Sequence, residues 1–137
     1  MTPEALAALH ARAMAPDRGW SAAEFADLLD NAHAFALGDA RAFALGRAVA
    51  GEAELLMLAT DPAHRRQGLA RARLAAFEAE ARARGASIAF LEVAADNAPA
   101  RVLYTAAGWV ERARRPAYYA RPKGPAADAL IMVRALT

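Results

Sequence analysis

The sequence predicts an α/β fold in which helices pack against one mixed β-sheet. Short apolar runs that end at glycine turns are typical of strands, and they alternate with longer segments whose apolar residues recur with helical spacing. No repeat, linker or low-complexity segment divides the 137 residues. A chain of this length has room for one core, so we expect a single domain over residues 1–137 with the element order ααβββαβαββ.

Two helices and three strands are expected in the first half of the chain. Thr2 and Pro3 form a helix start, and this helix is expected to run to about residue 13. The sequence Ser21-x-x-Glu24 is a capping box that begins a second helix, which runs to about residue 30. Glycine-containing breaks then separate three predicted strands at 33–37, 42–49 and 54–60.

In the second half, helices that end at glycines alternate with strands. One helix is predicted over 69–84 with Gly85 as its stop, and another over 97–107 with Gly108 as its stop. Further strands are predicted at 87–94, 109–114 and 130–136. Because nothing divides the chain, both helices must pack on the same sheet.

The composition excludes several kinds of chemistry. The chain has no cysteine, which excludes disulfides, thiolate catalysis and an acyl-cysteine intermediate. The three histidines lack the spacing of metal ligands, so no metal is expected. No apolar run approaches the roughly 20 residues of a membrane helix, and the first residues lack the basic start of a signal peptide. We therefore expect a cytoplasmic protein with no membrane partner.

A glycine-containing turn between a strand and a long helix is the strongest candidate for a ligand site. The apolar run Leu55–Ala59 is broken by Asp61-Pro62, and Gly68 then falls at the entrance of the helix. The first amides of a helix lack intrahelical partners, and the helix dipole favours an anion there. The Arg65–Arg71 segment is therefore predicted to hold a phosphate. It lacks the Gly-Lys-Ser/Thr and Gly-x-Gly-x-x-Gly patterns of nucleotide loops.

Glu92 is the first candidate for acid–base chemistry. It lies in the apolar segment Ile88–Val93, and strand alternation puts it on the same face as Ile88 and Phe90. Carboxylates are rarely buried without a partner, and burial raises the pKa of a carboxylate toward the range that suits a general base. The alternative is a glutamate near the strand end that simply reaches solvent.

Tyr104 is the second candidate. With Asn97 and Arg101 it forms a polar stripe on the predicted helix, opposite a packing face of small and apolar residues. A phenol can give its proton to a departing thiolate, so Tyr104 is a candidate general acid. A half-buried aromatic side chain with its hydroxyl at the surface is the alternative interpretation.

Several motifs together resemble the GCN5-related N-acetyltransferase (GNAT) family. Arg65-x-x-Gly68-x-Ala70 resembles the family's Arg/Gln-x-x-Gly-x-Gly/Ala signature. Leu91-Glu92-Val93, followed by Asn97-x-x-Ala100-x-x-Leu103-Tyr104-x-x-x-Gly108-Trp109, is similar in spacing to the ribosomal-protein-alanine N-acetyltransferase (RimI) branch. The resemblance implies the GNAT fold, of the α/β (α+β) class, with a central mixed, mostly antiparallel sheet and helices on both faces.

The resemblance also implies an activity and roles for individual residues. The cosubstrate would be acetyl-coenzyme A (acetyl-CoA), with no metal, and the amine would attack the thioester directly. Glu92 would be the general base and Tyr104 the general acid. The residues implied to bind acetyl-CoA are Leu58, Ala59, Thr60, Arg65, Arg66, Gln67, Gly68, Leu69, Ala70, Arg71, Asn97 and Tyr104.

The acceptor implied by this branch is the N-terminal α-amine of a protein, possibly a ribosomal one, and nucleic acid is not expected as a partner. Two alternatives stay open. One is acetylation of a small amine or antibiotic, with Tyr118 and Tyr119 enclosing a compact acceptor. The other is a non-catalytic module that binds acetyl-CoA, or RNA through the basic residues of 112–123. Pro116-Ala117 makes the segment before Tyr118 one residue longer than is common in the branch, and this segment is expected to shape the acceptor groove.

Overall fold

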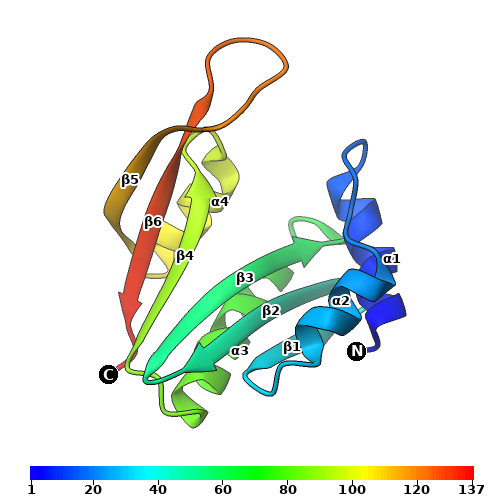
Figure 1. Ribbon diagram of the computed structural model, residues 1–137, viewed down its shortest axis with the longest axis vertical. Coiled ribbons are helices and arrows are strands. Elements are labelled where there is room, and N and C mark those ends of the chain that lie inside the picture. Colours follow the sequence, from blue (N-terminus) through cyan, green and yellow to red (C-terminus); the bar gives the residue numbers. More distant parts are fainter.

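The computed structural model describes residues 1–137 and has the predicted order of elements (Figure 1). The helices are α1 (Pro3–Met14), α2 (Ala22–Leu29), α3 (Leu69–Ala83) and α4 (Ala98–Ala106), with a short 3₁₀ helix, η1 (Pro62–His64). The strands are β1 (Ala34–Asp39), β2 (Ala42–Val49), β3 (Glu52–Thr60), β4 (Ile88–Ala94), β5 (Val110–Tyr119) and β6 (Ala127–Ala135). Both predicted caps of the first two helices form, including the reciprocal capping box of Ser21 and Glu24.

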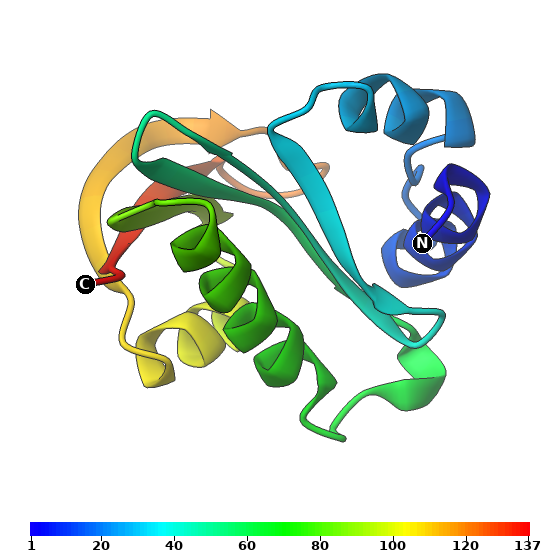
Figure 2. The same ribbon diagram turned by 90° about the horizontal axis from the view of Figure 1, so that it is seen from below.

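The six strands form one sheet in the order β1-β2-β3-β4-β6-β5. Every neighbouring pair is antiparallel except β3 and β4, which are parallel, so the expected mixed, mostly antiparallel sheet is confirmed. Figure 2 shows α3 and α4 on one face of the sheet and α1 and α2 on the other. No helix is long and apolar enough to cross a membrane.

The two central strands pair over only a short stretch. Parallel pairing joins Glu52–Glu54 of β3 to Ile88–Phe90 of β4 and then stops. Beyond that point the two strands diverge, as Figure 1 shows. From Leu55 to Thr60, β3 pairs with β2 alone, so its other edge faces the opening between the strands.

A bulge in β3 changes which side chains face each side of the sheet. Gly46 of β2 pairs with Leu55, whereas Leu45 pairs with Met57, so Leu56 is an extra residue. Before the bulge, Leu55 belongs to the core under α3 and α4. After it, Leu58 packs on that side and Ala59 belongs to the smaller core under α1 and α2.

Helix α3 packs closely on the sheet because one strand position has no side chain. A Cβ atom at Gly46 would lie 2.6 Å from the Phe77 ring, which stacks on Phe35 at a centroid distance of 5.9 Å. Any larger residue at position 46 would push α3 away from β2. This contact fixes the helix whose first turn borders the site.

The structure corrects the predicted limits of the last two strands. β5 continues to Tyr119 instead of ending near residue 114, and β6 begins at Ala127 instead of residue 130. β5 lies at the edge of the sheet, where a proline and irregular pairing are tolerated. The strand therefore runs past Pro116 and brings Tyr119 to the site.

Candidate active site

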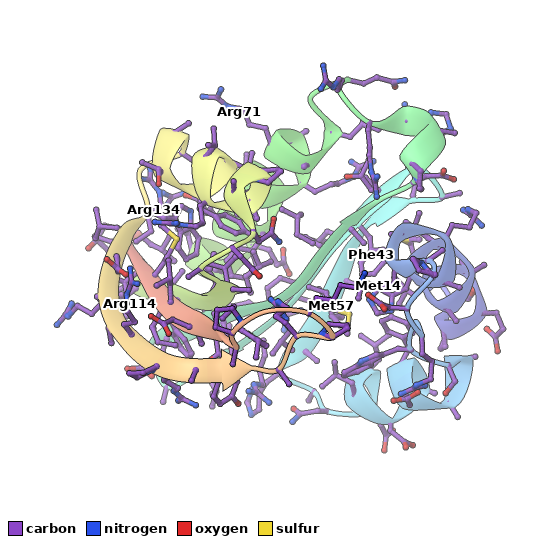
Figure 3. The ribbon with its side chains drawn as sticks, turned by 90° about the horizontal axis from the view of Figure 1, so that it is seen from above. Met14, Phe43, Met57, Arg71, Arg114 and Arg134 are labelled. Atoms are coloured by element: carbon purple, nitrogen blue, oxygen red, sulfur yellow. The ribbon has the colours of Figure 1, made fainter.

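A cavity of about 1090 Å³ opens between the diverging halves of β3 and β4. Its walls come from β3, β4, the start of α3, one side of α4 and the end of α1, including Met14, which Figure 3 labels with Met57 of β3. Glu92 lines this cavity, and so do all the residues predicted to bind acetyl-CoA except Gln67. The structure therefore brings the predicted strand, turn and helix residues together at one place.

The start of α3 offers unpaired backbone amides to the cavity. Gly68 is the N-cap residue and supplies no side-chain cap, and the first intrahelical bond runs from the Ala72 amide to the Gly68 carbonyl (3.1 Å). The amides of Leu69, Ala70 and Arg71 therefore have no partner within the helix. The first turn also carries no acidic residue, so the helix dipole favours an anion at this point.

Gly68 is required by its backbone conformation. Its φ of 75° is left-handed, which an L side chain adopts only at a cost. The space around it is open, because no protein atom lies within 4 Å of an added Cβ. A side chain here would clash with no part of the protein, so only the backbone conformation, and not the space around it, favours glycine at this position.

Three arginines add positive charge around these amides. Arg65 and Arg66 precede Gly68, and Arg71 lies in the first turn of α3 and extends outward in Figure 3. All three line the cavity, and the ion pairs of the structure involve other arginines. The charge of this turn is therefore available to an anionic ligand.

Of the two interpretations of Glu92, the structure favours the one in which the side chain reaches solvent. Glu92 shares a face with Ile88 and Phe90 as expected, but the buried face of β4 is the opposite one, which carries Ala89 and Leu91. The Glu92 side chain is 29% exposed, and its Oε2 accepts a hydrogen bond from the Tyr119 hydroxyl (3.2 Å). Its Oε1 lies 3.8 Å from Nε of Arg115. The carboxylate is thus open to the cavity and held by two side chains of β5.

Tyr104 is more buried than a member of an exposed polar stripe would be. It is only 8% exposed and belongs to the main core, with its ring 6.1 Å from that of Trp109, while Arg101 is exposed. The predicted stripe is wrong because the helix turns Tyr104 toward the sheet. Burial raises the pKa of Tyr104 to about 12. The residue lines the cavity, so a protonated phenol borders the space between β3 and β4.

Asn97 has a structural task in addition to lining the cavity. Its Oδ1 accepts a hydrogen bond from the Ala100 amide (3.3 Å) and so caps α4. The side-chain amide of asparagine also carries two N–H donors, and no hydrogen bond within the protein uses those of Asn97. Asn97 can therefore hold the helix start and donate to a ligand at the same time.

Three side chains of the site were not among the predicted site residues. Tyr119 and Arg115 contact Glu92, and Arg121 makes a two-pronged ion pair with Asp96 at 2.7 and 2.8 Å. The sequence pointed to Tyr119 only in the alternative with a compact acceptor, and to Arg115 and Arg121 only as basic residues of 112–123. These contacts join residues 23 to 27 positions apart, so spacing along the chain does not reveal them.

The chain matches the model of the acetyltransferase (GNAT) family over residues 6–109. It belongs to this family. The segment matched in [ribosomal protein bS18]-alanine N-acetyltransferase from Escherichia coli strain K12 is 42% identical over 86 residues, which are 63% of this chain and 57% of that protein. The corresponding enzyme of Haemophilus ducreyi is 41% identical over 81 residues, 59% of this chain and 56% of its own length. The chain thus spans little more than half the length of the curated relatives it matches.

Solved structures of the family have the same fold. The crystal structure of the ribosomal-protein-S18-alanine N-acetyltransferase from Escherichia coli superposes with a TM-score of 0.86 and 34% identity, covering 98% of this chain and 88% of that one. Ard1 from Thermoplasma volcanium superposes with a TM-score of 0.82 and 25% identity, covering 100% and 95%. Nourseothricin acetyltransferase has a TM-score of 0.65 and 27% identity over 73% of this chain and 60% of its own. The predicted GNAT fold is confirmed.

Proposed function

We propose that this chain is an acetyl-CoA-dependent N-acetyltransferase, with residues 1–137 acting as a single domain. One observation carries the proposal. An uncapped helix start, an unpaired strand edge, a carboxylate and a protonated phenol all border one cavity. Membership of the acetyltransferase family supports it.

The donor site would use backbone groups for most of its contacts. The free amides of Leu69, Ala70 and Arg71 suit the pyrophosphate of coenzyme A, and Arg65 and Arg66 add charge. The unpaired edge of β3 at Leu58–Thr60 suits an extended arm, and Asn97 can donate to the same arm. Acetyl-CoA would supply an acyl group activated as a thioester.

The acid–base roles then follow from position. An α-amine, with a pKa near 8, is mostly protonated at neutral pH and must lose a proton before it can attack. Glu92, which is open to the cavity, would take that proton directly or through a water. The amine nitrogen then bonds to the acyl carbon while the carbon–sulfur bond breaks, and a backbone amide of β3 stabilises the oxyanion. Tyr104 would donate its proton to the leaving sulfur, and the second proton that the acylated nitrogen loses would return the phenolate to the phenol.

We propose the N-terminal α-amine of a protein, possibly a ribosomal one, as the acceptor. Two bacterial relatives are named [ribosomal protein bS18]-alanine N-acetyltransferase, and these names support this choice. The similarity to the Escherichia coli structure also supports it. Tyr119 and Arg121, which line the cavity, would lie beside a chain end that enters it. Nucleic acid is not expected as a partner, and the cytoplasmic location stays a prediction.

A small amine or antibiotic is the second candidate acceptor. Nourseothricin acetyltransferase, at 27% identity, is a member of this fold whose name states such a substrate. Tyr118 and Tyr119, packed edge to face at 5.1 Å, would then close over a compact molecule. A non-catalytic acetyl-CoA or RNA-binding module is the third possibility.

One assay separates these candidates. Release of the coenzyme A thiol is measured with N-terminal peptides that begin with alanine and other residues, with lysine side-chain peptides and with small amines. Preferential turnover of free N-terminal peptides supports the proposal, and turnover of small amines alone supports the second candidate. Binding of acetyl-CoA without thiol release for any acceptor, or salt-sensitive RNA binding, would favour the non-catalytic module.

A further inference from the structure

We propose that Asp128 is a positioning residue that fastens a bulge in β5 and thereby brings Tyr119 to Glu92. The proposal rests on the proposed function, because it assigns Glu92 to the acceptor amine. The bulge itself and its fastening follow from the geometry of the two last strands.

The bulge is visible in the pairing of β5 with β6. Arg115 pairs with Ala129 and Tyr119 pairs with Ala127, so the three residues 116–118 lie opposite Asp128 alone. Regular pairing would place one residue there, and β5 therefore carries two extra residues. Within them Ala117 has a left-handed φ of 50°, which costs free energy for a residue with a side chain. Other contacts must hold this conformation.

Asp128 supplies those contacts. Its Oδ1 accepts a hydrogen bond from the Ala117 amide (2.9 Å), and its Oδ2 accepts one from Nη1 of Arg114 (3.2 Å). The Ala117 amide, helped by Arg114, lowers the pKa of Asp128. The backbone carbonyl of Asp128 accepts from the Ala95 amide (2.8 Å), just past the end of β4. One residue is thus bonded both to the bulge and to the strand that carries Glu92.

The bulge determines which residue of β6 lies opposite Tyr119. Had β5 continued regularly from the pair of Arg115 with Ala129, Tyr119 would lie opposite residue 125. It lies opposite Ala127 instead, which is two residues, or about 7 Å, closer along the strand. From this position the Tyr119 hydroxyl reaches Oε2 of Glu92 at 3.2 Å. Without the fastening, Glu92 would lose the hydrogen bond that orients its carboxylate.

Asp128→Ala tests the proposal, and Glu111→Ala is its matched control. Both residues are acidic partners of Arg114, since Glu111 accepts from its Nη2 at 2.9 Å, but only Asp128 touches the bulge. We expect Asp128→Ala to lower kcat about tenfold, as a misplaced catalytic group does, with the Kd of acetyl-CoA within twofold. Hydrogen exchange at the Ala117 amide should accelerate in the same variant. Glu111→Ala should leave kcat, the Kd of acetyl-CoA and hydrogen exchange at the Ala117 amide unchanged.

A double-mutant cycle with Tyr119→Phe shows whether Asp128 acts through Tyr119. Tyr119→Phe removes the hydroxyl and keeps the bulge, so it should lower kcat by a similar factor with the Ala117 amide still protected. The double variant should then be no slower than the slower single variant, because both changes remove one interaction. If Asp128→Ala does not fold, the cycle is run with Asp128→Asn, whose uncharged oxygen accepts a weaker hydrogen bond from the Ala117 amide, so kcat should fall about threefold.

Three results would overturn the proposal, and two of them are kinetic: equal kcat for Asp128→Ala and Glu111→Ala, or additive losses in the cycle. Unchanged exchange at Ala117 in Asp128→Ala would also overturn it, because the bulge would then not depend on Asp128. Exchange is measured without any substrate. A parent chain that releases no thiol with any acceptor would therefore count against the proposed function, while the exchange result still decides whether Asp128 fastens the bulge.

Discussion

The two sides of the cavity differ in the groups that line them, which are mainly backbone groups on one side and side chains on the other. On the side of β3 and α3, the groups that face the cavity are mainly backbone: unpaired amides in the first turn of α3 and the free edge of β3 beyond Leu55. On the side of β5, they are the side chains of Glu92, Tyr119 and Arg121. Tyr119 donates a hydrogen bond to Glu92, and two residues outside the lining, Arg115 and Asp96, form ion pairs with Glu92 and Arg121 respectively. We call these the donor side and the acceptor side.

The difference bears on what each side can recognise. Backbone amides at a helix start hold a phosphate whatever the neighbouring side chains are, so a donor side of this kind suits one constant ligand. A network of side chains on an edge strand changes with each substitution, and it suits an acceptor that differs between relatives. The comparison predicts that variants on the two sides affect different kinetic constants.

Glu92→Gln is expected to have the largest effect. The amide cannot take a proton from the acceptor amine, so kcat should fall by about 10³-fold. The Kd of acetyl-CoA should stay within twofold, because Glu92 belongs to the acceptor side. Single-turnover thiol release and calorimetry measure the two quantities, with the exposed strand residue variant Glu52→Gln as control. Equal rates in Glu92→Gln and the parent would remove Glu92 from the mechanism.

Tyr104→Phe tests the one catalytic candidate that borders both sides. Loss of the hydroxyl should slow acetyl transfer by about 10²-fold while the ring keeps its contact with Trp109. An acetyl thioester analogue whose thiol has a lower pKa should restore part of the rate, because its thiolate leaves without being protonated. A variant that transfers as fast as the parent would leave Tyr104 with a packing role only.

The same substitution should change stability at alkaline pH. Burial raises the pKa of Tyr104 from an ordinary value near 10 to about 12, so the folded state disfavours the ionised phenol. The contribution of Tyr104 to stability is therefore present below pH 10 and is lost as the pH rises toward 12. Two pKa units correspond to about 3 kcal/mol. Urea unfolding at pH 9 and near pH 12 should show this loss in the parent and not in Tyr104→Phe.

Gly68→Ala should act on the donor side alone. The added methyl group would stand in open space at the start of α3, where we expect it to hinder the approach of a phosphate, so the Kd of acetyl-CoA should rise about tenfold. Gly85→Ala is the matched control, because Gly85 also has a left-handed φ, 88°, with no protein atom within 4 Å of an added Cβ. Both variants should lose about 1 kcal/mol of stability from backbone strain. Equal acetyl-CoA binding in the two would separate Gly68 from the ligand.

The two sides also differ in how far the sequence predicts them. The donor side follows from local rules: an apolar strand, a glycine at a helix start and a following periodic helix place the amides without any distant contact. Glu92 and Tyr104 were predicted as site residues, but how far each side chain is buried was not. Strand alternation says which residues of β4 share a face and not which face is covered, and helical spacing groups Tyr104 with Arg101 without saying which of them faces the sheet. Tyr119 and Asp128 depend on a bulge in an edge strand, whose pairing no local pattern specifies.

Arg121→Gln is expected to have the smallest effect and to act on the acceptor side. Its loss frees Asp96 and weakens the anchoring of the segment that carries Tyr119, whose ring lies 5.6 Å from the Arg121 guanidinium. Because this ion pair is largely exposed, the KM of the acceptor should rise only about threefold, with the Kd of acetyl-CoA unchanged. Arg41→Gln breaks a similar pair with Asp39 away from the cavity and should alter neither constant. A change in acetyl-CoA binding by Arg121→Gln would instead mean that the donor side extends across the cavity to residues 119–121.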